Sequence, residues 1–386
     1  MGITEDEFKK LSFYQQKVFC NQKRPVIFNK KTTQPFAGGT LTLESLANLR
    51  IRTEEKLTQP RITRISQFNV VEGYDNPTGS WFRDKVDISA LQANHDNNEA
   101  VFQIASNFNG LEAAGNPHDE LMIYLSPGFF VQGETAAISA APGLIYRCYF
   151  VPHIINGKMY YGQLEKQINF LQAFNGKSLP FIQINNGYVQ NTNKIAAAFQ
   201  KYSDKALIEV AGNIKIGFQE GIQVPFGLSK LKNECPVNGV TKWQLNNDSN
   251  HYISQVFSAA LMVPSTSDDK YKNLAYMLLR GSYEGTLKST FVQGKQKVFL
   301  PLIGGGVFHN KLAWIHKALI EAIQESLPYG LDITLVIYNS ELYRKDADWK
   351  TFESDLAALT QETGGKYLRY KNDGTYKVEE NQSTVK

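Results

Sequence analysis

The pattern of apolar and polar residues predicts a chain in which short strands alternate with helices. Residues 100–105 (AVFQIA) form a short apolar run with β-branched and aromatic side chains, which is typical of a strand buried on both faces. Further strands are predicted at 121–125, 206–210 and 214–223. Apolar residues at helical spacing predict helices at 43–57, 134–144, 162–174, 273–290 and 349–359.

The clearest unit of the chain lies between residues 297 and 338. Residues 297–303 (KVFLPLI) predict a strand, which Gly304-Gly305-Gly306 interrupts. Residues 311–327 then carry apolar side chains on one helical face, and 331–338 (LDITLVIY) predict a second strand. This order is a βαβ unit, whose crossover is right-handed and whose strands are parallel. The sequence therefore predicts an α/β protein with a mixed or mostly parallel central sheet and helices on both faces.

Three regions are predicted along the chain. Residues 1–66 form a basic N-terminal leader, partly helical, with twelve Lys or Arg residues against six Asp or Glu. Such a leader could contact an acidic partner or a lipid surface, or could simply be a solvated face. Residues 67–372 form the α/β domain, and 373–386 form a polar tail that is expected to be frayed.

Composition excludes several classes of protein. The net charge of +4 is too balanced to make nucleic acid the expected partner, and no apolar run is long enough for a membrane span. Cys20, Cys148 and Cys235 are far apart, and the six histidines form no HExxH motif. We therefore expect no disulfide framework, no metal and no cofactor.

The first candidate site is the glycine triplet with Val307 and Phe308. Residues without a Cβ let backbone N–H groups approach an anion closely, and the start of the following helix adds a favourable dipole. A phosphate is the natural ligand of such a loop, although the motif is neither GxxxxGK[ST] nor GxGxxG. The alternative is a tight turn without a ligand. Asn339, at the end of the next predicted strand, either reaches the same edge or forms a turn.

The second candidate site follows the predicted strand at 100–105. Asn107, Asn109 and Glu112 lie directly after it, and ligands bind beyond the carboxyl ends of strands in open α/β sheets. Asparagine can hold sugar hydroxyls, and a glutamate can exchange a proton. The alternative is that the asparagines form turns and Glu112 caps a helix.

The third candidate site is rich in small residues and spans 132–143 (QGETAAISAAPG). Gly133, Ala136 and Gly143 would give a floor on which a diphosphate or ribose could lie. Thr135 is a candidate helix N-cap, which would place Glu134 beside the helix N-terminus. The alternative is close packing of this helix against the sheet.

Three segments together resemble the ligand loops of macrodomains, the ADP-ribose-binding α/β/α family: AVFQIASNFNGLE, QGETAAISAAPGLIYR and VFLPLIGGGVFHN. The resemblance is to a divergent branch, because the usual Asn-Ala-Ala-Asn loop reads Ser106-Asn107-Phe108-Asn109 and the glycine run lies in a later loop. Asp87-Ile88 is similar to the early Asp-Ile pair of the family, whose aspartate holds the adenine amine. The resemblance implies a three-layer, macrodomain-like fold with an N-terminal extension.

The resemblance also implies a role for each loop. Gly304 to Phe308 would wrap the diphosphate, Gly133 and the stretch 136–143 would form the opposite wall, and Asn107 and Asn109 would approach the distal ribose. No motif fixes the catalytic acid. Glu112 and Glu134 are therefore chosen on chemical grounds, because a carboxylate can activate water and stabilise an oxocarbenium-like transition state.

Divergent macrodomains of this kind occur among effectors of intracellular bacteria, and some resemble hydrolases of ADP-ribosylarginine. The sequence thus predicts a mono-ADP-ribosyl hydrolase whose substrate is an ADP-ribosylated protein, most plausibly at arginine. Its place would be the cytoplasm or, as a virulence effector, a host cell. The alternatives are a reader that binds ADP-ribose without cleaving it, another nucleotide or nucleotide-sugar enzyme, and an interaction protein with an inert pocket.

Overall fold

The computed structural model describes residues 26–28, 35–58, 64–73, 86, 88–112, 132–163, 166–176, 178–228, 243–245, 250–264, 269–372 and 376–380. Within this part of the chain, one sheet of ten strands has the order β1-β2-β9-β12-β4-β13-β14-β3-β15-β16. In that order the strands are β1 (Val26–Phe28), β2 (Pro35–Ser45), β9 (Lys215–Gln223), β12 (Tyr252–Ser258), β4 (Val101–Ala105), β13 (Lys297–Pro301), β14 (Asp332–Ile337), β3 (Gln67–Gly73), β15 (Tyr367–Asn372) and β16 (Tyr376–Glu380).

The centre of the sheet is parallel. The strands β12, β4, β13, β14, β3 and β15 run in one direction, with Val101 of β4 paired to Ser254 on one side and to Val298 on the other. The strand β9 is antiparallel to β12 and to β2, and β16 is antiparallel to β15. The predicted mixed α/β sheet is therefore confirmed.

Among the described residues, three antiparallel strand pairs lie outside this sheet. They are β5–β6 (Pro152–Ile155 and Lys158–Tyr161), β7–β8 (Ile184–Asn185 and Tyr188–Val189) and β10–β11 (Phe226–Leu228 and Trp243–Leu245).

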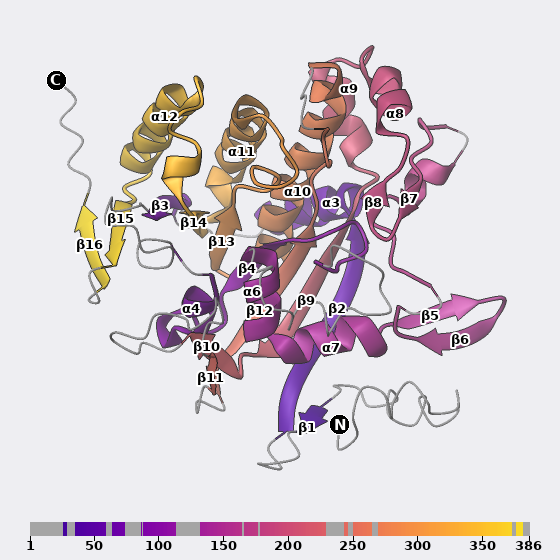
Figure 1. The fold of residues 1–386 in the computed structure, drawn as a ribbon, viewed down its shortest axis with the longest axis horizontal. Coiled ribbons are helices and arrows are strands. Elements are labelled where there is room, and N and C mark those ends of the chain that lie inside the picture. The colour runs from indigo at the N-terminus through magenta and orange to yellow at the C-terminus, as the bar shows by residue number, and fades with distance from the viewer. Residues whose placement is uncertain are drawn as a thin grey trace.

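Helices cover both faces of the sheet. They are α3 (Leu46–Leu57), α4 (Ile88–Ala93), α6 (Gln132–Ser139), α7 (Ala141–Tyr149), α8 (Thr192–Phe199), α9 (Asp204–Ala211), α10 (Lys272–Val292), α11 (Leu312–Ser326) and α12 (Trp349–Glu362). Figure 1 shows α9, α11 and α12 above the sheet and α4, α6 and α7 below it, so the molecule has three layers. None of the helices that the structure describes is both long and apolar enough to cross a membrane.

Glycines let two helices approach the sheet closely. A Cβ at Gly281 of α10 would lie 2.7 Å from Cδ1 of Ile214, just before β9. A Cβ at Gly143 of α7 would lie 2.9 Å from Cδ1 of Ile222 in β9. The small residues of these helices therefore serve tight helix-to-sheet packing.

The strongest sequence patterns predicted their elements correctly. The strands at 100–105, 214–223, 297–303 and 331–338 are β4, β9, β13 and β14, and the helices at 273–290, 311–327 and 349–359 are α10, α11 and α12. The helix at 134–144 is two helices, α6 and α7, which meet at Ala140, with a proline at the start of α7. The strand at 121–125 lies outside the described residues.

Two of the predicted helices and strands were wrong. Residues 206–210 are part of α9, which Ser203 caps by accepting a hydrogen bond from the Ala206 N–H, and whose residues Leu207 and Ala211 are buried one turn apart. Residues 166–171 are not helical; beyond them only the short 3₁₀ turn Gln172–Asn175 follows. Instead, Phe170 donates its N–H to Phe108 O (2.9 Å) and accepts from Lys215 N (2.8 Å), so tertiary backbone bonds replace the helical ones.

Part of the expected leader belongs to the sheet. The strand β2 pairs with β9 from Gly38–Ile222 to Ser45–Lys215, and Ser45 caps α3. The basic residues described in this region bond within the protein. Arg52 pairs with Glu44, Arg64 pairs with Asp332, and Lys56 Nζ donates to Phe291 O.

The other end of the chain also joins the sheet. The strand β16, within the tail that was expected to be frayed, pairs along its length with β15. That expectation is wrong for Tyr376–Glu380, while residues 373–375 and 381–386 lie outside the described part.

Candidate functional site

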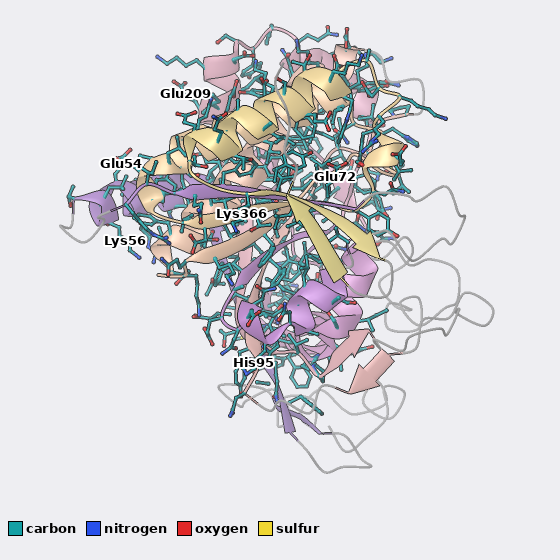
Figure 2. All side chains as sticks on the ribbon, turned by 90° about the vertical axis from the view of Figure 1, so that its left-hand side faces the viewer. Glu54, Lys56, Glu72, His95, Glu209 and Lys366 are labelled. Atoms are coloured by element: carbon teal, nitrogen blue, oxygen red, sulfur yellow. The ribbon has the colours of Figure 1, made fainter. Side chains whose placement is uncertain are left out.

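The candidate segments follow neighbouring parallel strands at their carboxyl ends. Residues 106–112 follow β4, residues 302–310 follow β13, and residues 338–343 follow β14. Because these strands are adjacent and parallel, their carboxyl ends share one edge of the sheet. Glu72, next to the last residue of β3, marks that edge in Figure 2, on the opposite side of the molecule from Glu54 and Lys56.

The glycine loop is closed by its own hydrogen bonds. Gly304 has a φ of +76°, its O accepts from Asn310 N (3.0 Å), and Gly306 O accepts from His309 N (3.0 Å). The Asn310 side chain lies under the loop and donates to Leu261 O (2.8 Å), Gly304 O (3.3 Å) and Phe308 O (3.3 Å). The loop is therefore a fixed turn rather than a flexible connection.

Three successive N–H groups of this loop are not used in its closure. The backbone N–H groups of Gly306, Val307 and Phe308 donate to no acceptor among the described residues. Val307 is 69% exposed, and a Cβ at Gly306 would meet open space. Consecutive free amides beside the start of α11 are suited to bind an anion.

The loop after β4 is held by its asparagines. Asn107 and Asn109 are both buried. Asn109 Oδ1 accepts from Leu111 N (3.1 Å), and its Nδ2 donates to Gln167 Oε1 (3.0 Å). The turn-forming alternative therefore describes the Asn109 side chain, whereas Asn107 lies at the start of the same turn, where its N–H donates to Leu111 O.

A hairpin that the sequence analysis missed joins the two loops. The strands β7 and β8 are connected by Asn186-Gly187, whose φ angles of 47° and 78° fit a type I′ turn. Gly187 O accepts from Phe108 N (2.9 Å), and the Tyr188 ring lies 6.0 Å from the Phe308 ring. An Asn-Gly pair between Ile184-Asn185 and Tyr188-Val189 was the available sequence signal.

Glu112 lies against a buried arginine that the sequence analysis also missed. Arg147 of α7 is fully buried, and its Nη2 lies 3.4 Å from Glu112 Oε1. The same guanidinium donates to Gly110 O (2.9 Å) and Gln219 Oε1 (2.9 Å) and stacks on the Phe257 ring (3.9 Å). The Glu112 side chain is therefore held at the end of the loop after β4 by a buried cation from α7.

The small-residue segment packs on the sheet. Ala136 is buried and its O accepts from Gln255 Nε2 (3.3 Å), while Gly143 O accepts from Gln219 Nε2 (3.1 Å). These contacts fit the packing alternative, and a ligand contact from Ala136 or Gly143 stays a prediction. Gln255 Oε1 also lies 3.5 Å from Arg147 Nη1, which joins α6 to the Arg147–Glu112 pair.

The first residue of α6 shows that the predicted N-cap role of Thr135 is wrong. The helix begins at Gln132, so Thr135 lies inside its first turn and is not the N-cap that was predicted. Gly133 and Glu134 also belong to that first turn, as expected for groups near the helix N-terminus. The side chains of Glu134 and Thr135 are outside the described part of the structure.

The remaining predicted residues flank the end of β14. Asn339 is buried and its Oδ1 accepts from Glu341 N (3.0 Å), so it caps a short turn, as the alternative reading proposed. Val86 N donates to Tyr338 O (3.2 Å), which places Val86 beside this strand end. Ile88 is buried at the start of α4, and Asp87 lies outside the described residues.

No metal centre is evident in the site. Among the residues that the structure describes, no three His, Cys, Asp or Glu side chains are grouped so that they could hold a metal ion.

Comparison with known proteins gave structural similarity only. No protein-family model and no curated protein sequence matches the chain. It is similar to the poly(ADP-ribose) glycohydrolase of Deinococcus radiodurans in complex with ADP-ribose, at 12% identity and a TM-score of 0.41, over 83% of this chain and 95% of that one. It is also similar to the poly(ADP-ribose) glycohydrolase of Thermomonospora curvata bound to the inhibitor ADP-HPD, at 10% identity and a TM-score of 0.38, over 90% and 97% of the chains. Similarity this low carries no argument about what this chain binds or cleaves.

Proposed function

We propose that this protein is a hydrolase of macrodomain-like fold that removes mono-ADP-ribose from modified proteins, at arginine side chains. The observation that carries the proposal is the row of three unused N–H groups at Gly306, Val307 and Phe308, next to the loop that holds Asn107 and Glu112. The resemblance of the three loop sequences to macrodomains supports ADP-ribose as the ligand of that edge.

The order of the strands supports one orientation of the ligand. The strand β13 lies between β4 and β14, and neighbouring strands are about 4.8 Å apart. A diphosphate on the loop after β13 would then place the distal ribose toward the loop after β4 and the adenosine toward Ile88 and the end of β14. The order of the loops after β4, β13 and β14 therefore matches the order of distal ribose, diphosphate and adenosine in ADP-ribose.

The proposed chemistry is cleavage of an N-glycosidic bond at the distal ribose. The transition state has oxocarbenium character, so a carboxylate near the anomeric carbon stabilises it and can activate water. Glu112, beside Arg147, is one candidate for that role, and Glu134, in the first turn of α6, is the other. Asn107 would orient the ribose, and Asn109 would hold the loop in place through Gln167.

Replacing Gly305 with valine will mainly weaken ADP-ribose binding. A Cβ at this position would lie 2.7 Å from the Tyr343 hydroxyl oxygen, so the loop or the tyrosine ring must move, and the larger valine should displace the amides from the phosphate. Hydrogen bonds to charged groups contribute about 1.5–3 kcal/mol each, so we expect at least a roughly tenfold loss of affinity by calorimetry. Gly176→Ala is the control, because this exposed glycine lies outside the loop and its added Cβ would make only an ordinary contact of 3.5 Å with Ala173 O. Equal affinities for the two variants would contradict the diphosphate site.

A release assay tests the proposed activity. The full-length protein is incubated with a protein that carries radiolabelled ADP-ribose on arginine, and free ADP-ribose is measured over time. Release at a rate that saturates with substrate supports the hydrolase. Retained label together with measurable ADP-ribose binding would instead identify a reader, and absence of both would overturn the proposal.

A further inference from the structure

We propose that the hydroxyl group of Tyr343 is a fourth hydrogen-bond donor to the diphosphate at the glycine loop, an inference that rests on the proposed function. Tyr343 follows β14 and the short 3₁₀ turn Ser340–Leu342, and it was not among the residues selected from the sequence.

The ring of Tyr343 lies directly on the glycine loop. A Cβ at Gly305 would lie 2.7 Å from Tyr343 Oη, 3.1 Å from its Cε1 and 3.2 Å from its Cζ. Only glycine therefore leaves room for the tyrosine at this point. The ring is held from the other side by Trp349, with 6.2 Å between the ring centroids and 13° between the planes. Its backbone is fixed by a hydrogen bond from Tyr343 N to Ser340 O (2.8 Å).

The Tyr343 hydroxyl is available to a ligand. It bonds to no described residue, the side chain is half-buried, and the hydroxyl oxygen is not among the buried polar atoms without a partner, so it can be reached from solvent. Burial raises the pKa of Tyr343 to about 12, so the hydroxyl keeps its proton across the physiological range. Tyr283, below the same loop, differs, because its hydroxyl donates to Pro301 O (3.0 Å) and accepts from Ile303 N (3.0 Å). Tyr283 thus fixes the start of the loop, while the hydroxyl of Tyr343 can donate a hydrogen bond to a ligand.

The neighbouring cations do not fill this role. Lys311, at the end of the loop, pairs with Asp269 (3.0 Å). Arg344, next to Tyr343, pairs with Glu72 (3.2 Å) and Glu341 (3.1 Å). Both cations are therefore already paired with carboxylates.

Calorimetric titration with ADP-ribose tests the inference on the full-length wild type, Tyr343→Phe and the control Tyr252→Phe. Phenylalanine keeps the ring on Gly305 and Trp349, so the melting temperature should not change. Loss of one hydrogen bond to a charged oxygen should weaken ADP-ribose binding about tenfold or more in Tyr343→Phe. Tyr252 starts β12 at the opposite edge of the sheet, so its variant should bind like the wild type.

The possible outcomes separate the two claims. If the wild type binds ADP-ribose and Tyr343→Phe binds equally well, the role of the hydroxyl is overturned and the proposed function stands. If the wild type does not bind ADP-ribose, the proposed function is overturned and this inference with it.

A double-mutant cycle adds a test of the contact itself. Gly305→Ala should weaken binding more in the wild type than in Tyr343→Phe, because the added methyl group meets the hydroxyl oxygen first. Equal fold-changes in the two backgrounds would contradict a hydroxyl that acts at the loop.

Discussion

Glutamine at position 112 or 134 should lower the turnover of ADP-ribosylarginine by about a hundredfold or more while ADP-ribose affinity changes little. A carboxylate stabilises the oxocarbenium-like transition state, whereas the amide of glutamine has no negative charge to do so. The diphosphate contacts are distant from the bond that breaks, so binding of the product is nearly unaffected. Single-turnover release of ADP-ribose, together with calorimetry of product binding, separates the two effects.

The environment of Glu112 demands a stability control. Its carboxylate lies beside the fully buried Arg147, and an uncompensated buried cation is costly. The melting temperature of Glu112→Gln must therefore be measured, and activity compared at a temperature where the variant is folded. Glu54→Gln, on the exposed opposite side of the molecule, is the activity control (Figure 2). Wild-type rates in both the Glu112 and Glu134 variants would show that neither carboxylate performs the reaction.

Glu284→Gln should lower the free energy of unfolding by about 3 kcal/mol or more, because it removes the charge of a buried carboxylate that is paired with cations. Glu284 lies within α10 and is 3% exposed. It accepts hydrogen bonds from Arg50 Nε (2.7 Å) and Nη2 (2.9 Å) and from Arg280 Nη1 (3.1 Å), and Lys288 Nζ lies 3.7 Å away. Burial alone would lower the pKa of Arg50, but the hydrogen bond and the charge of Glu284 outweigh that effect and raise it.

Loss of the Glu284 charge leaves Arg50, Arg280 and Lys288 around a buried side chain that no longer carries a negative charge. Chemical unfolding of the wild type, Glu284→Gln and the exposed control Glu54→Gln measures the effect, and the control should change stability by less than about 0.5 kcal/mol. A Glu284→Gln protein as stable as the control would mean that water or other groups compensate the cations. In that case the cluster does not hold α3 and α10 together.

The sequence predicted the helices and strands whose apolar pattern matches the way they are buried in the fold. The βαβ unit of β13, α11 and β14 was predicted because its strands are continuously apolar and its helix has one apolar face. The segment 206–210 was misassigned because five residues, ALIEV, are too short to separate a strand from a helix by periodicity. Its capping residue, Ser203, was the decisive signal.

The position of the glycine loop at the end of its strand was predicted correctly, whereas its role as a binding site stays a prediction. Residues Gly304 to Phe308 are consecutive in the chain, so the sequence alone shows that they form one loop. In the structure this loop lies at the carboxyl end of β13 and has backbone N–H groups without an acceptor. The contacts of Arg147 with Glu112 and of Tyr343 with Gly305 join residues that are 35 or more positions apart, and only the packing of the sheet and its helices creates them. Asn109 and Asn339 show the reverse case, since each carries a turn that the sequence had also allowed.

A crystal structure of the protein with ADP-ribose tests the central claim most directly. We expect diphosphate oxygens within hydrogen-bonding distance of the N–H groups of Gly306, Val307 and Phe308, with the distal ribose beside Asn107. ADP-ribose bound elsewhere, or a glycine loop that contacts no phosphate when ADP-ribose is saturating, would contradict the account.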